Sequence, residues 1–184
     1  MRTKQKAALF IEQRLVRDRT EAYHDARALA IEFARGEPST PFDPMAAGVV
    51  LKPGEIAYRQ VPLWIRVQQD GTWTDASFAD VIVTDLRLLS RFESRRLAWL
   101  WWSSIVGFHV DLAVEHKILD FGDAQPVCIS GPLVAPVAVV GIASVYGTEA
   151  ILTHHALALL RTRGSTAARR SASQKHNRVR PGNR

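Results

Sequence analysis

The stretch VIVTDLRLL, from Val81 to Leu89, carries the pattern that decides the fold expected for this chain. Two runs of β-branched and apolar residues are separated by a tight polar turn at Asp85. Short runs of this kind, bounded by turn residues, are typical of strands rather than helices. We therefore expect residues 81–84 and 86–90 to form two consecutive strands.

The same pattern extends in both directions, from Gly48 to Gly131. Turn signals such as Lys52-Pro53-Gly54 and Asp70-Gly71 separate the apolar runs. Six or seven short strands at regular spacing predict a small antiparallel barrel or sandwich, not a parallel α/β sheet, so the expected fold class is α+β, mainly β. Besides the pair 81–84 and 86–90, the apolar runs are 49–51, 56–58, 63–67, 97–103, 105–112, 117–121 and 126–130.

A helix is expected before the strands, over residues 4–35, because this segment lacks proline and glycine and is rich in Ala, Leu, Glu and Arg. Such a helix would be roughly 48 Å long, whereas a domain of this size is only about 30–35 Å across. It therefore either breaks or extends beyond the domain. Its apolar stripe either packs on its own domain, which the lack of a clean heptad favours, or joins a dimer or partner helix. The stripe comprises Ala8, Ile11, Leu15, Ala22, Ala26, Leu29 and Phe33.

Two helical segments are expected after the strands. Residues 134–146 are apolar on most of a helical surface, which predicts a largely buried helix. Gly147 interrupts it, and Thr148 is expected to cap a second stretch with Glu149 in the first turn. The apolar face of that stretch is formed by Ile151, Leu152, Ala156, Leu159 and Leu160.

These patterns divide the chain into an N-terminal helix (1–36), a linker (37–48), the β-rich domain (49–161) and a basic tail (162–184) that we expect to be disordered. The net charge of +6 is uneven. Residues 161–184 carry eight basic and no acidic residues, whereas residues 37–160 carry eight basic and thirteen acidic ones. The body is thus mildly acidic, which excludes a basic nucleic-acid-binding fold at the level of the domain.

The sequence predicts a soluble, cytoplasmic protein. The apolar run 7–11 is too short for a signal-peptide core, and the run 132–146 is too short for a membrane span. Cys128 is the only cysteine, so neither an intrachain disulfide nor a cysteine zinc cluster can form.

Three stretches resemble bacterial PH-like and GRAM-like domains, actinobacterial ones in particular. LKPGEIAY (51–58) is similar to their opening, VIVTDLRLL (81–89) to their central hairpin, and WWSSIVGFHVDL (101–112) to the strand pair that follows. Residues 137–160 are similar to their C-terminal helix, so the resemblance covers residues 49–161. It implies a small barrel closed by a C-terminal helix, and binding of proteins or lipid head groups rather than catalysis. Lipid-binding members carry basic residues in the first strand–strand loop, and the matching loop QQDGTWTD has none.

No catalytic site, metal site or cofactor is predicted. Cys128 lies in an apolar run, which favours an inert core thiol over a nucleophile paired with His109 or His116. The histidines 154–155 are adjacent, and helix neighbours point about 100° apart, so they do not make a metal pair.

Tryptophans in one strand-like run are the first candidate binding residues. In a strand, Trp99 and Trp101 share one face and Trp102 takes the other. One set is expected in the core and the other at the surface, where it would contact a protein partner or a membrane interface. Of the remaining tryptophans, Trp64 is expected in the core and Trp73 in a loop.

The basic tail is the second candidate, because flexible positive charges attract polyanions. Its candidate residues are Arg161, Arg163, Arg169, Arg170, Lys175, Arg178 and Arg180. The function predicted is a non-catalytic adaptor that binds an unidentified protein through the barrel. The alternatives are a peripheral membrane-lipid binder and a protein that associates with nucleic acid through the tail. A homodimer through the N-terminal helix is a further alternative.

Overall fold

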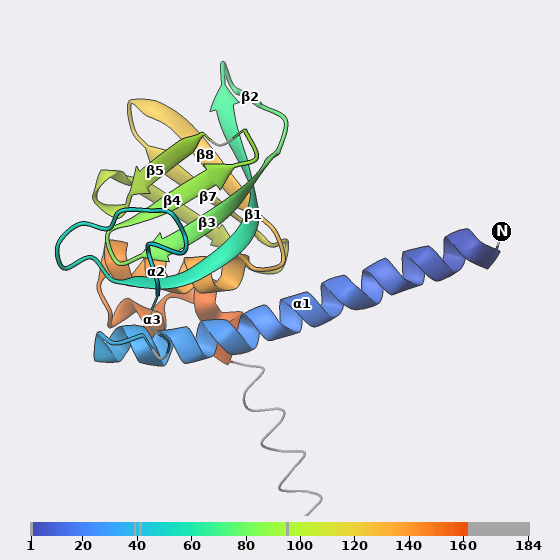
Figure 1. The fold of residues 1–184 in the computed structure, drawn as a ribbon, viewed down its shortest axis with the longest axis horizontal. Coiled ribbons are helices and arrows are strands. Elements are labelled where there is room, and N and C mark those ends of the chain that lie inside the picture. The colour runs from blue at the N-terminus through green and yellow to red at the C-terminus, as the bar shows by residue number, and fades with distance from the viewer. Residues whose placement is uncertain (1, 39, 41, 95, 162–184) are drawn as a thin grey trace, which may run out of the picture.

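The computed structural model describes residues 2–38, 40, 42–94 and 96–161. Figure 1 shows a curved β-sheet beside a long N-terminal helix. The helices are α1 (Arg2–Arg35), α2 (Val134–Tyr146) and α3 (Ala150–Thr153), with 3₁₀ turns η1 (Trp102–Ser104) and η2 (His155–Leu157). The strands are β1 (Ala57–Gln69), β2 (Thr72–Trp73), β3 (Ser77–Thr84), β4 (Arg87–Phe92), β5 (Leu97–Trp101), β6 (Gly107–Asp111), β7 (His116–Phe121) and β8 (Ala124–Ser130).

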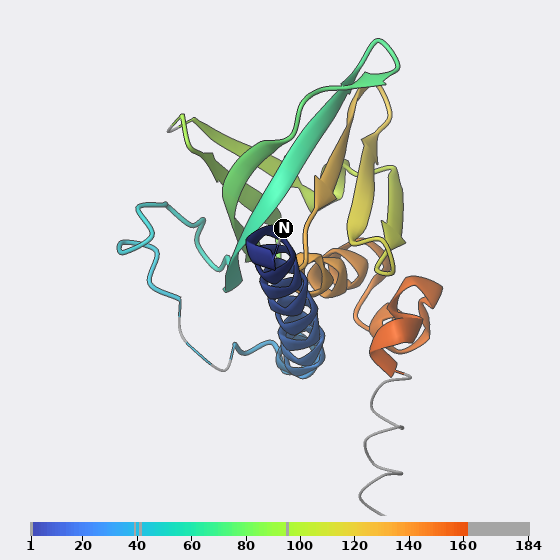
Figure 2. The same ribbon diagram turned by 90° about the vertical axis from the view of Figure 1, so that its right-hand side faces the viewer.

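The strands form one antiparallel sheet in the order β5-β4-β3-β1-β8-β7-β6, with β2 folded back on the tip of β1. β1 has 13 residues and serves both halves, since it pairs with β3 along most of its length and with β8 from Trp64 to Val67. The sheet bends at β1 into two layers, and α2 lies across the end between them (Figure 2). Four strands, three strands and a closing helix make a PH-like barrel, so the predicted fold class is confirmed.

Alternation along the strands explains the core. Val61, Leu63 and Ile65 of β1 point inward and are buried, as a period of two requires. Helix α2 is buried from Val134 to Ala143, as its uniformly apolar sequence predicts. The sheet and α2 therefore share one continuous core.

Gly141 lets α2 approach the sheet. A Cβ at this position would lie 2.6 Å from Cζ of Phe108 and 3.1 Å from Cζ3 of Trp102. We expect Gly141→Ala to destabilise the domain by about 1–3 kcal/mol through overpacking, although alanine is the better helix former. Urea unfolding tests this, and adding Phe108→Leu, which makes room, should restore part of the loss. A Gly141→Ala variant as stable as the wild type would contradict the close approach.

Helix α1 is continuous over 34 residues. Its C-terminal half packs on α2 and the start of β1, where Ala22, Ala26 and Leu29 are buried. Arg59 of β1 forms ion pairs of 2.8 Å with Asp25 and with Glu32 of α1. The N-terminal half projects beyond the body of the domain (Figure 1). The apolar stripe thus packs on its own domain from residue 22 onward. The side chains of its residues 8, 11 and 15 are not among the side chains that the structure describes.

The apolar run 49–51, placed at the start of the β-rich domain by its sequence, does not form a strand. Together with residues 42–48, it lies across the outer face of the sheet as a strap (42–51). Phe42, Ala47, Val49 and Leu51 of the strap form a second small core there, against Ala57, Ile82 and Leu89. Arg91 of β4 donates a hydrogen bond to the carbonyl of Ala47 and ties the strap down.

Three further expectations are corrected. The two strands expected at 56–58 and 63–67 are one strand, because Pro62 lies where β1 pairs with β3 alone and does not break it. Thr148 does not cap the last helix, which has Glu149 at its N-cap, and the helical stretch breaks at His154. Trp102 leaves the strand and begins η1.

Candidate functional site

A buried ionic network fixes the turn that follows the strap, residues 52–55, to the hairpin of β3 and β4. The Glu55 carboxylate, whose side chain has 0% exposure, accepts two hydrogen bonds of 2.8 Å from the Arg87 guanidinium. It also accepts from the Lys52 N–H and from the Thr84 hydroxyl, each at 2.8 Å. Burial by itself would raise the pKa of Glu55, but these hydrogen bonds, Arg87 foremost, lower it. Glu55 is therefore charged at neutral pH.

Two tryptophans are held by the same unit. The Trp102 indole N–H donates to the Thr84 carbonyl at 2.8 Å, and this side chain is buried. The Trp101 ring lies under the Lys52 ammonium at 4.1 Å and the Arg87 guanidinium at 4.7 Å. The stretches LKPGE and VTDLR thus form a rigid support, and Trp101 and Trp102 belong to it.

Trp99 is different, because it is 55% exposed on the outer face of β5. Leu97, two residues earlier on the same face, is 49% exposed. Trp99 lies opposite Leu89 of β4, which the strap covers, and the exposed Val50 of the strap accepts a hydrogen bond from Arg87 through its carbonyl. We call the surface of Leu97 and Trp99 the β5 face.

Cations border the β5 face. Lys52 sits on Trp101 at one end, and Arg91 lies opposite Leu97 at the other. The exposed Arg96 precedes Leu97, but alternation turns its side chain to the opposite face of the strand, where it lies over the Phe92 ring. Apolar groups with flanking cations suit a partner surface that is apolar at its centre and acidic at its rim.

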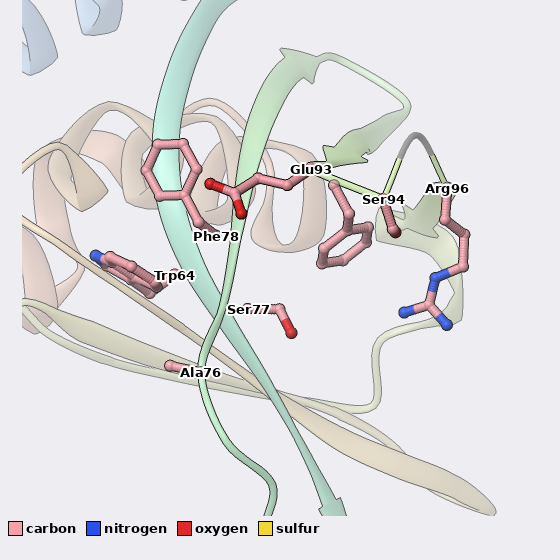
Figure 3. Close-up of a pocket in the computed structure, with 8 residues that line it drawn as sticks. Trp64, Ala76, Ser77, Phe78, Glu93, Ser94 and Arg96 are labelled. Carbon is pink, nitrogen blue, oxygen red and sulfur yellow. The ribbon is translucent and has the colours of Figure 1, made fainter.

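A hollow of about 360 Å³ lies between the start of β3 and the connection from β4 to β5, and the Glu93 side chain is part of its lining (Figure 3). Trp64 and Phe78 lie on one side of it, with ring centroids 5.2 Å apart in an edge-to-face arrangement. On the other side the Arg96 guanidinium lies 5.1 Å from the Phe92 ring. Trp64 was expected in the core, which is wrong: it is 46% exposed, because Leu63 and Ile65 take the inward positions of β1.

The predicted site residues are thus separated. Trp99 and Trp101 share the outer face of β5, and Trp102 is buried. Trp73, expected in a loop, instead lies in the short strand β2. Arg161 donates two hydrogen bonds of 3.1 Å to the His154 carbonyl, beside α3 and away from β5. Arg163, Arg169, Arg170, Lys175, Arg178 and Arg180 lie outside the described residues. Leu97 was missed, although the alternation in LAWLW (97–101) would have placed it beside Trp99.

The groups weighed for catalysis show no activation. Cys128 and His116 border a common hollow with Arg66, and burial raises the pKa of the Cys128 thiol despite the nearby guanidinium. A protonated thiol is a weak nucleophile. Within the described ranges, no cluster of three or more His, Cys, Asp or Glu side chains could hold a metal ion. The rings of His154 and His155 stack on each other, 4.6 Å apart.

None of the helices in the described part of the chain is long and apolar enough to cross a membrane. No protein-family model matches the sequence, and no curated protein is detectably similar to it. Among solved structures, the Vps36 N-terminal PH domain is similar to this chain, with 14% sequence identity and a TM-score of 0.40. The match covers 57% of this chain and 87% of that domain. It is the strand order described above, not this likeness, that identifies the PH-like fold.

Proposed function

We propose that this chain is a cytoplasmic, non-catalytic adaptor that binds another protein through the β5 face. The observation that carries the proposal is the exposure of Trp99 and Leu97 side by side on a rigidly supported strand. Exposed tryptophan is the residue type most enriched among those that dominate binding energy at protein interfaces. Because Leu97 and Trp99 lie on a strand paired with β4, little backbone ordering entropy is lost on binding.

A protein partner is favoured over a lipid head group by the position of the charges. The loop at the tip of β1 and β2, residues 68–75, carries no basic residue that could hold a phosphate. The cations Lys52, Arg91 and Arg96 instead border an apolar strand. Polar groups around an apolar centre are the usual anatomy of a protein interface.

The test is capture of partners from the source cells with the full chain, followed by mass spectrometry and affinity measurement on the protein found. Trp99→Ser should weaken that interaction by about 2 kcal/mol, roughly 30-fold. Leu152→Ser is the matched control, since Leu152 is 70% exposed on α3, away from β5, and it should leave binding unchanged.

Three outcomes would contradict the proposal. One is a partner whose affinity Trp99→Ser leaves unchanged. Another is that the full chain captures only nucleic acid, and that a truncated chain ending at Arg163 captures none. The third is binding to anionic vesicles that persists in the truncated chain, without any protein partner.

A further inference from the structure

β5 is an open edge of the sheet. It pairs with β4 on one side, and among the described residues no strand pairs with the other side. Main-chain N–H and C=O groups at such an edge are free to bind an added strand.

The hydrogen-bond register shows which groups face outward. The N–H of Phe92 donates to the Arg96 carbonyl, and the N–H of Trp102 donates to the Leu86 carbonyl. Hydrogen-bonded and non-bonded pairs alternate along an antiparallel ladder. Ala98 and Leu100 therefore bond to β4, while the N–H and C=O groups of residues 97, 99 and 101 point to the open edge.

This edge also lacks the usual protection. The sequence LAWLW (97–101) contains no charged residue, proline or glycine that would discourage pairing. At the other end of the sheet, by contrast, β6 carries Gly107, His109 and Asp111. An apolar edge strand left uncovered invites aggregation, and a partner strand is what would cover it.

We infer that the β5 edge binds an extended, acidic segment of the partner protein, which adds to the sheet as a further strand. This inference rests on the proposed function and adds which part of the partner protein binds and in which conformation. Residues 97, 99 and 101 would supply up to about six main-chain hydrogen bonds. Alternate apolar side chains of the added strand would pack beside Leu97 and Trp99.

The charges select an acidic segment. Lys52 and Arg91 lie on the outer face beside β5, and Arg96 lies at its N-terminal end. A second copy paired through its own β5 would bring the same cations onto one continuous face, where like charges repel. An acidic segment instead pairs with them.

The probe is a displayed library of random twelve-residue linear peptides, selected on the full chain. We expect the selected peptides to be rich in acidic and alternating apolar residues. Leu97→Pro removes an outward N–H and leaves the hydrogen bonds to β4 intact. It should lower the affinity for the selected peptides at least tenfold more than Leu97→Ser does. The serine variant is the matched control, because it loses the same side chain and keeps the N–H.

Amide hydrogen exchange of the wild-type chain gives a second measurement that needs no variant. Bound peptide should slow exchange at least tenfold at residues 97, 99 and 101, and should leave Ala98 and Leu100, which already bond to β4, unchanged. Protection without this alternation, or protection centred on β6, would overturn strand addition at β5.

The remaining outcomes are also decisive. Equal peptide affinities for Leu97→Pro and Leu97→Ser would overturn strand addition. A free chain that is dimeric, and that Leu97→Pro makes monomeric, would overturn the acidic segment in favour of a second copy. If Trp99→Ser abolishes partner binding and Leu97→Pro spares it, the proposed function stands and strand addition fails. If both variants bind normally, both fail.

Discussion

Replacing Arg87 with methionine is expected to lower the free energy of unfolding by about 3–5 kcal/mol, because the variant leaves the Glu55 carboxylate buried without its counter-ion. Arg87 supplies both of the guanidinium hydrogen bonds to a side chain that has 0% exposure. It also stacks on Trp101 and bonds to the Val50 carbonyl, so the β5 face should loosen as well. Urea unfolding at pH 7, with the β5 amides followed by NMR, measures both effects.

Two variants control this experiment. Arg17→Met removes an exposed ion pair with Glu21 and should change stability by less than about 0.5 kcal/mol. Arg87→Met combined with Glu55→Gln removes both charges and should recover at least about 1 kcal/mol of the loss. If the double variant is no more stable than Arg87→Met, the uncompensated carboxylate is not the cause.

The same pair predicts a pH dependence. The folded-state pKa of Glu55 is below its ordinary value of 4.5, so the unfolded chain takes up a proton first as the pH falls. The stability that the pair contributes is therefore present above about pH 4.5 and is lost as the pH falls through the folded-state pKa. The double variant should lack this component of acid unfolding.

Lys117→Met is expected to stabilise the domain by about 2 kcal/mol at pH 7, since an amine without a partner is costly to bury. Lys117 of β7 is fully buried, its Nζ has no hydrogen-bond partner in the described structure, and the Phe108 ring lies 5.9 Å away. Burial lowers the pKa of Lys117 well below 10.5. Methionine fills a similar volume and brings no charge.

The sign of the pH effect follows from the lowered pKa. Between the folded-state pKa and 10.5, the unfolded chain binds the Lys117 proton and the folded chain does not. Stability therefore rises with pH across this range, with a slope approaching about 1.4 kcal/mol per pH unit. Urea unfolding from pH 6 to pH 10 should show the slope in the wild type and in Lys52→Met, whose lysine is exposed, but not in Lys117→Met. Identical slopes in all three chains would contradict a neutral buried amine.

Local sequence predicted those features that depend on local pattern. The uniformly apolar run gave helix 134–146 with the bounds observed, and turn residues separated most of the strands. The strap escaped prediction because its apolar run resembles a strand. Its position depends on Glu55, Arg87 and Arg91, and the contact of Arg91 with Ala47 joins residues 44 positions apart.

The site was predicted in part. Trp99 stood out by composition, and strand alternation put Trp99 and Trp101 on one face. Nothing in the local sequence marks the end of β5 at residue 101. The sequence therefore could not show which of the tryptophans 99, 101 and 102 is buried, and the structure buries Trp102 in η1. Lys52 follows the strap and Arg91 belongs to β4, so only the tertiary fold brings these two cations to the β5 face.

The central position of β1 has a consequence for how the domain unfolds. Both layers of the barrel are built on this one strand, with β3 on one side of it and β8 on the other. Neither layer can melt by itself without removing the template of the other. The barrel should therefore open as one cooperative unit, without a half-folded intermediate.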